Sequence, residues 1–226
     1  MKPTDKRRIF ALVRAGLAVV LAVILLAATG FAAADLLRGP VPVTEGAALQ
    51  AGTYVQVDIR HIMSCFAVER DAKGSALAYY GAVPLGTRFV AVRFSQRQLA
   101  DAALIESETE DFLTGARDTM SVHFIAAGRV RPMGDDLSPY FDQWFEENVP
   151  WMTAAGVIAD IDDPALYLSD MIIEADRVGT VDYGWAVGLS VAAGVLLVYA
   201  VVELTLILAK VYDRPGKVKR EEKTNA

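Results

Sequence analysis

The sequence predicts an α+β membrane protein in which two transmembrane helices flank a β-rich, OB-like barrel domain with one or two helices. Three observations lead to this fold class. Two long apolar runs lie near the ends of the 226-residue chain, strand-like segments with alternating apolar and polar residues lie between them, and a helical segment interrupts these strands. Hydrophobic residues make up 54% of the chain, and their excess is concentrated in the two runs.

The two apolar runs are long enough to cross a bilayer. Residues 15–34 contain no charged residue, and residues 185–209 contain only Glu203. About 20 apolar residues in a helix span a hydrocarbon core that is roughly 30 Å thick. We therefore expect transmembrane helices at residues 9–34 and 185–209. Three alanines precede Asp35, so a cleavable signal peptide ending at Ala34 is the alternative for the first run and would leave one span.

Basic residues lie between each apolar run and the nearer end of the chain. Residues 1–14 carry a net charge of +4 and residues 210–226 a net charge of +3, whereas residues 35–184 hold 11 basic and 23 acidic residues. Positively charged flanks stay in the cytosol. The sequence thus predicts a multi-pass protein of the cell membrane with cytosolic basic tails at 1–8 and 210–226 and an extracytoplasmic domain at 35–184.

The central domain is predicted to be rich in strands. Strands are expected at residues 53–59 with an extension over 63–68, at 76–80, at 88–94 and at 121–131, and a final strand or helix at 165–176. Turns are expected at 71–74 and 83–86, and Gly128 indicates a bulge.

Two helices are expected within this domain. One begins after Ser95, with Gln98 at the capping-box position, and stops near Gly115, and the other covers residues 138–149. A helix between the third and fourth strands matches the five-stranded Greek-key barrel called the OB-fold, although other small β-barrels give a similar order of elements.

The domain shows no pattern typical of a catalytic, metal or cofactor site. Motifs of dinucleotide-binding, P-loop, serine hydrolase and zinc protease sites do not occur in the sequence. His61, Cys65 and His123 are too few and too widely spaced for a zinc site, and the apolar surroundings of Cys65 predict a buried thiol. We therefore predict no catalytic residue, no metal and no cofactor, and the acidic domain disfavours binding of nucleic acid.

Two features of the apolar runs are candidate sites. Arg14 and Glu203 lie at matching depths, roughly 8–9 Å from the cytosolic ends of the predicted helices. A carboxylate inside a bilayer is costly and generally has a partner, so we expect an Arg14–Glu203 pair. The alternatives are that each side chain reaches the interface alone or that Glu203 meets another subunit. Gly184, Gly188 and Ala192 recur every fourth position, a spacing that permits close helix packing.

Four segments carry a resemblance to a protein family: residues 52–55, 88–92, 128–133 and the aromatic helix at 140–144. On these segments the chain resembles uncharacterised bacterial membrane proteins with two spans and a single β-rich extracytoplasmic domain. The resemblance covers most of the chain and implies no catalytic residue.

These expectations favour a membrane-anchored extracytoplasmic binding or scaffolding module, a subunit of an envelope protein complex. Its partners are then the lipid bilayer and another protein, an envelope glycan or a second copy of the chain, and not nucleic acid. The alternative is an envelope hydrolase that uses carboxylates of the outer domain, and a third hypothesis is a subunit of a transporter or secretion complex. A deep cleft with convergent carboxylates would favour the hydrolase, and a filled barrel with an exposed apolar or aromatic patch would favour the binding module.

Overall fold

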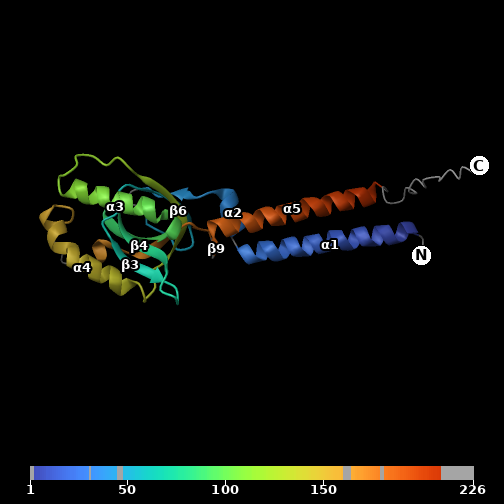
Figure 1. Cartoon of the computed structure of the whole chain (residues 1–226), viewed down its shortest axis with the longest axis horizontal. Helices are drawn as coiled ribbons and strands as arrows, with labels where there is room; N and C mark the ends of the chain where they lie inside the picture. Colours follow the sequence, from blue (N-terminus) through green and yellow to red (C-terminus); the bar gives the residue numbers. More distant parts are fainter. Residues whose placement is uncertain (1–2, 31, 45–47, 160–163, 179–180, 210–226) are drawn as a thin grey trace, which may run out of the picture. The chain divides into compact units, whose positions relative to one another are not determined.

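The computed structural model describes residues 3–30, 32–44, 48–159, 164–178 and 181–209. The predicted tail at 210–226 and the first two residues of the N-terminal tail lie outside the described residues. The fold is a mixed α+β structure with a seven-stranded sheet and two long apolar helices, one toward each end of the chain (Figure 1). The chain divides into two compact units, Met1–Ala33 with Gly184–Ala226, and Ala34–Tyr183.

The helical unit consists of α1 (Pro3–Thr29) and α5 (Tyr183–Leu208), which run antiparallel side by side (Figure 1). Each helix has a row of alanines that are at most 5% exposed. These alanines are Ala11, Ala15, Ala18 and Ala22 on α1 and Ala186, Ala193 and Ala200 on α5. Spacings of three, four and seven residues place each row on one helix face, and small side chains let the two helices approach closely.

The first predicted span, residues 9–34, is divided in the structure. Gly30 adopts a φ of 56°, a left-handed conformation that glycine reaches without strain and that commonly ends a helix. α1 therefore stops at Thr29, and a separate short helix, α2 (Ala32–Arg38), follows.

The sheet of the second unit has the strand order β1-β2-β6-β7-β5-β4-β3. Neighbouring strands are antiparallel, except that β1 pairs parallel with β2 and β5 pairs parallel with β7. The strands are β1 (Val41–Pro42), β2 (Tyr54–Ile59), β3 (Cys65–Arg70), β4 (Ala76–Leu85), β5 (Arg88–Ser95), β6 (Phe124–Pro132) and β7 (Leu168–Ala175). The structure does not confirm an OB-like barrel, because β1 and β3 are the two ends of the ladder and do not pair with each other within the described residues.

Helices cover both faces of this sheet (Figure 1). The single turn η1 (Gln96–Gln98) leads into α3 (Leu99–Leu113), whose Ala102 and Ile105 pack on a core that includes Val92 and Ile173. On the other face, α4 (Ser138–Ala154) packs its aromatic residues against Phe89. The single turn η2 (Pro164–Leu166) precedes β7, and the short strands β8 (Arg177–Val178) and β9 (Val181–Asp182) form a separate hairpin that leads into α5.

Several element boundaries differ from the sequence prediction. β4 runs through the expected turn at 83–86, since Val83 pairs with Val90 and is buried, and the chain turns only at Gly86. α4 continues through Pro150 to Ala154. Gly128 forms no bulge, because it pairs in register with both neighbouring strands. The last segment is a strand, β7.

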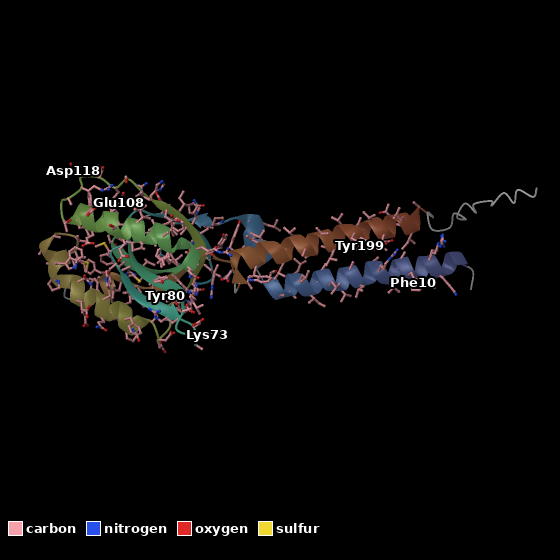
Figure 2. The ribbon with its side chains drawn as sticks, in the orientation of Figure 1. Phe10, Lys73, Tyr80, Glu108, Asp118 and Tyr199 are labelled. Atoms are coloured by element: carbon pink, nitrogen blue, oxygen red, sulfur yellow. The ribbon has the colours of Figure 1, made fainter. Side chains whose placement is uncertain are left out.

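β6 begins at Phe124, later than predicted, because the Glu108 side chain accepts hydrogen bonds from backbone N–H groups that precede this strand. The Glu108 carboxylate on α3 accepts hydrogen bonds from the backbone N–H of Ser121 at 2.9 Å and of Val122 at 3.1 Å, and also from the Ser121 hydroxyl (Glu108 is labelled in Figure 2). Arg117 adds an ion pair at 2.8 Å. The hydrogen bonds from Ser121 hold the pKa of Glu108 below its ordinary value, so this carboxylate fastens the loop to α3 in its ionised form.

Candidate functional site

The structure brings Arg14 and Glu203 together in the helical unit. Nη2 of Arg14 lies 2.9 Å from Oε1 of Glu203, and the Tyr199 hydroxyl donates to the same oxygen at 2.9 Å (Tyr199 is labelled in Figure 2). The Glu203 side chain is 8% exposed, whereas that of Arg14 is 53% exposed. The carboxylate is thus enclosed by α1 and α5, while the guanidinium remains accessible at the surface of the helix pair.

The predicted packing residues Gly184, Gly188 and Ala192 are exposed on α5. A methyl group added to Gly188 would meet no atom within 4 Å. α1 packs against a different side of α5, where Ala200 contacts Ala15 and Ala18. The residues that pack in this pair therefore recur every seventh position, as in a left-handed antiparallel helix pair, and not every fourth position.

We expect Arg14→Gln and Glu203→Gln to be non-additive. Polar contacts between helices in a bilayer contribute about 0.6 kcal/mol on average and about 1.7 kcal/mol at most, so the coupling between the two changes should fall in this range. The measurement is a double-mutant cycle on the unfolding of the full chain in bicelles. Arg14→Gln combined with Thr205→Ala, a change at an exposed position of α5, should be additive. Additive effects of Arg14→Gln and Glu203→Gln would show that the pair contributes nothing.

The domain holds a second polar cluster, a row of charged side chains across the sheet face that α4 covers only in part. Its residues alternate in sign over four strands: Glu69 on β3, Arg93 on β5, Glu174 on β7 and Arg131 on β6. We call these four residues the charge ladder. Arg93 and Glu174 are only 6% and 5% exposed, so both ions are removed from water and need the partners they have.

Two ion pairs define the charge ladder. Oε2 of Glu69 accepts hydrogen bonds from Nε of Arg93 at 3.0 Å and from the Tyr80 hydroxyl at 3.0 Å, and Nη2 of Arg93 lies 2.9 Å from it. Oε1 of Glu174 lies 2.9 Å from Nε of Arg131 and 3.3 Å from Nη1 of Arg177. Burial raises the pKa of Glu69, but the hydrogen bonds and charge of Arg93 outweigh it and hold this pKa below the ordinary value.

Both ends of the charge ladder reach a pocket of about 390 Å³ beside the start of α4. Glu69, Tyr80 and Arg131 line its polar side, and Phe66 and Tyr140 are among its aromatic residues. We call it the Tyr140 pocket. Figure 2 labels Tyr80 on the sheet near this place. The pocket combines charged side chains, which are held by ion pairs within the charge ladder, with aromatic side chains. This combination is typical of ligand sites.

The two histidines and the cysteine do not form a common site. Nδ1 of His123 lies 2.7 Å from Asp58, whose carboxylate also bonds Arg60, and His61 stacks obliquely on Phe112 with ring centroids 5.7 Å apart. Cys65 is exposed, which corrects the prediction of a buried thiol, because β3 is an end strand of the sheet. In the part of the chain that the structure describes, no three His, Cys, Asp or Glu side chains are grouped to hold a metal ion.

Residues 6–206 match the family model of a domain of unknown function (DUF8577). The chain belongs to this family. No curated protein and no solved structure matches the chain. Because the family model extends from α1 into α5, it contains Arg14, Glu203 and the charge ladder, so the helix pair and the β-rich unit together make up the family's domain.

The charge ladder is not among the residues that the sequence singles out. Its members come from four strands that are distant in the sequence, and no spacing rule connects them. The sequence gives one weak indication of a buried charge at Arg93. This residue follows four apolar residues in β5, at a position where alternation predicts an inward side chain. A buried ionisable residue at such a position requires a partner of opposite charge, although the sequence does not identify the partner.

Proposed function

We propose that this chain is a two-span membrane protein whose helix pair anchors an extracytoplasmic binding module of an envelope complex. The observation that carries the proposal is the exposure of the apolar side chains of α1 and α5. Only 22% of the most apolar window of α1 and 17% of that of α5 is buried, and side chains such as Val13 and Val198 are more than half exposed. A core helix of a water-soluble protein buries such residues, whereas lipid covers them in a bilayer.

The buried carboxylate of Glu203 agrees with this placement. It lies five residues before the end of α5, about 7.5 Å along the helix axis, and the exposed Arg14 can extend its guanidinium toward the headgroups. The proposed orientation places both termini in the cytosol, because basic residues flank both helices at that end. Arg14 and Glu203 then fix the register of the helix pair at the inner side of the membrane.

A binding module fits the domain better than a hydrolase that uses carboxylates. A catalytic acid at neutral pH needs a raised pKa. The pKa values of Asp58, Glu69 and Glu108 are instead lowered by hydrogen bonds or by paired arginines. None of these three carboxylates therefore has the raised pKa of a catalytic acid, and the Tyr140 pocket is the candidate binding surface.

Labelling of Cys65 tests the proposed topology, since this residue is the chain's only cysteine and is exposed on the domain. We expect a membrane-impermeant maleimide to label Cys65 in intact cells. In the matched variant Cys65→Ser/Lys6→Cys, labelling should require permeabilised cells. Labelling of Cys65 only after permeabilisation would contradict the proposal. If a signal peptide is cleaved after Ala34, the mature chain is shorter and lacks residue 6. A shortened chain without the Lys6→Cys label would therefore show cleavage and a single span.

A further inference from the structure

We propose that the Tyr140 pocket binds a neutral sugar unit of a glycan. This inference rests on the proposed function as a binding module and adds the class of ligand. Three properties of the pocket support it: donors and acceptors that are held by ion pairs, an exposed aromatic ring in the same pocket as a rigid aromatic wall, and a neighbouring sheet edge that is unsuited to a peptide.

The polar side of the pocket is held in place from below. Glu69 is fixed through Oε2 by Arg93 and Tyr80, and Arg131 is fixed through Nε by the buried Glu174. Among the described residues, Oε1 of Glu69 and the two Nη atoms of Arg131 bond no other side chain. The pocket therefore presents free acceptor and donor atoms whose positions do not have to be ordered when a ligand binds.

The mixture of charges selects against simple ions. Glu69 and Asp136 repel an anion, and Arg131 repels a cation. A hydroxyl group both donates and accepts, so it can bond a carboxylate and a guanidinium at the same time. A sugar ring carries several hydroxyls and can offer such groups to both side chains, and hydrogen bonds to charged groups are the stronger ones.

The aromatic side of the pocket suits the apolar C–H face of a sugar ring. Phe66 is fixed by Phe141, with ring centroids 4.9 Å apart, and by Tyr80 at 6.4 Å. Tyr140, in the first turn of α4, is 57% exposed, so its ring is free to stack on a ligand. A volume of about 390 Å³ is at the small end of ligand pockets and suits one sugar unit with its neighbours outside.

The adjacent edge of the sheet disfavours a peptide ligand. A peptide would bind most readily by adding a strand to β3, which forms one wall of the pocket. The pairing of β3 with β4 is interrupted between Cys65 and Ala67 and between Glu69 and Arg70. The N–H of Cys65 already donates to Glu106 at 3.0 Å. Irregular, charged edges of this kind oppose strand addition.

Saturation-transfer NMR on the full chain in nanodiscs tests the proposal. Nanodiscs are required because maltoside detergents carry a sugar headgroup that would compete. The probes are maltotriose, cellotriose and the trimer of N-acetylglucosamine, each at millimolar concentration. We expect at least one probe to receive saturation on its ring C–H protons. Tyr140→Ala should weaken its affinity about tenfold, as expected for the loss of an aromatic stacking partner.

Two matched variants separate the pocket from the rest of the surface. Tyr140→Phe keeps the ring and should retain binding, as should Leu104→Ala, which removes an exposed apolar side chain from α3 on the other face of the sheet. The proposal is overturned if no probe binds, if Tyr140→Ala binds like the wild type, or if L-phenylalanine binds and the sugars do not. The assay does not depend on membrane orientation. The labelling of Cys65 can therefore contradict the proposed topology while sugars still bind, and sugar binding can fail while the labelling agrees with the topology.

Discussion

Gly128→Ala is expected to lower the free energy of unfolding of the domain by about 3 kcal/mol, a large effect for a single methyl group. An added Cβ would clash with the carbonyl oxygen of Glu174 and would lie 2.9 Å from the Cα of Ala175. Both are backbone atoms of β7, so no side chain can rotate away to make room. The two strands would have to separate where they are hydrogen-bonded.

The position of Gly128 explains why this separation is costly. Gly128 pairs with Val55 of β2 on one side and with Ala175 of β7 on the other, so β6 cannot move away from β7 without disturbing β2. The same displacement would shift Arg131 relative to Glu174, the ion pair between these two strands. The loss therefore combines strained packing with a weakened buried charge.

Urea denaturation of the full chain in micelles, followed by tryptophan fluorescence, provides the measurement. Gly16→Ala is the matched control, because the same methyl group on α1 meets no atom within 4 Å and alanine is the better helix former. We expect the control to leave the stability of the domain unchanged. A change below about 1 kcal/mol for Gly128→Ala would contradict the close approach of β6 and β7.

The sequence was most informative where a pattern is local. The uninterrupted apolar runs and the β-branched strand at 88–94 predicted α1, α5 and β5, because composition and alternation over ten to twenty-five residues determine these elements. β4 was predicted too short, since Ala82 and Val83 are both buried and a strand covered on both faces does not alternate.

Features that depend on the pairing of distant segments were not predictable. The parallel pairing of β5 with β7 connects strands that are separated by α3, β6 and α4, and it places Arg93 beside Glu174. The side of α5 that meets α1 depends on the partner helix, and the regular row of Gly184, Gly188 and Ala192 lies exposed on another side of α5. Arg14 and Glu203 were recognisable because a charge in an apolar run is conspicuous without knowledge of the fold.

Glu69→Ala is expected to destabilise the domain by about 3 kcal/mol, and Arg93→Met by only about 1 kcal/mol. The difference follows from unequal burial within one ion pair. The Arg93 side chain is 8% exposed and the Glu69 side chain 38% exposed. Removal of the carboxylate leaves a guanidinium buried without its partner, whereas removal of the guanidinium leaves a carboxylate that reaches water and keeps its bond from Tyr80.

The double variant Glu69→Ala/Arg93→Met should therefore be more stable than Glu69→Ala alone, because it no longer buries an unpaired charge. Acid provides an independent measurement on the same pair. The pKa of Glu69 is lower in the folded chain than its ordinary value of 4.5, so its ionisation stabilises the fold above that pH, and the contribution is lost as the pH falls through the lower, folded value. We expect Arg93→Met to weaken this acid dependence. Equal losses for the two single variants, or a double variant less stable than Glu69→Ala, would mean that Arg93 is not held in place by Glu69.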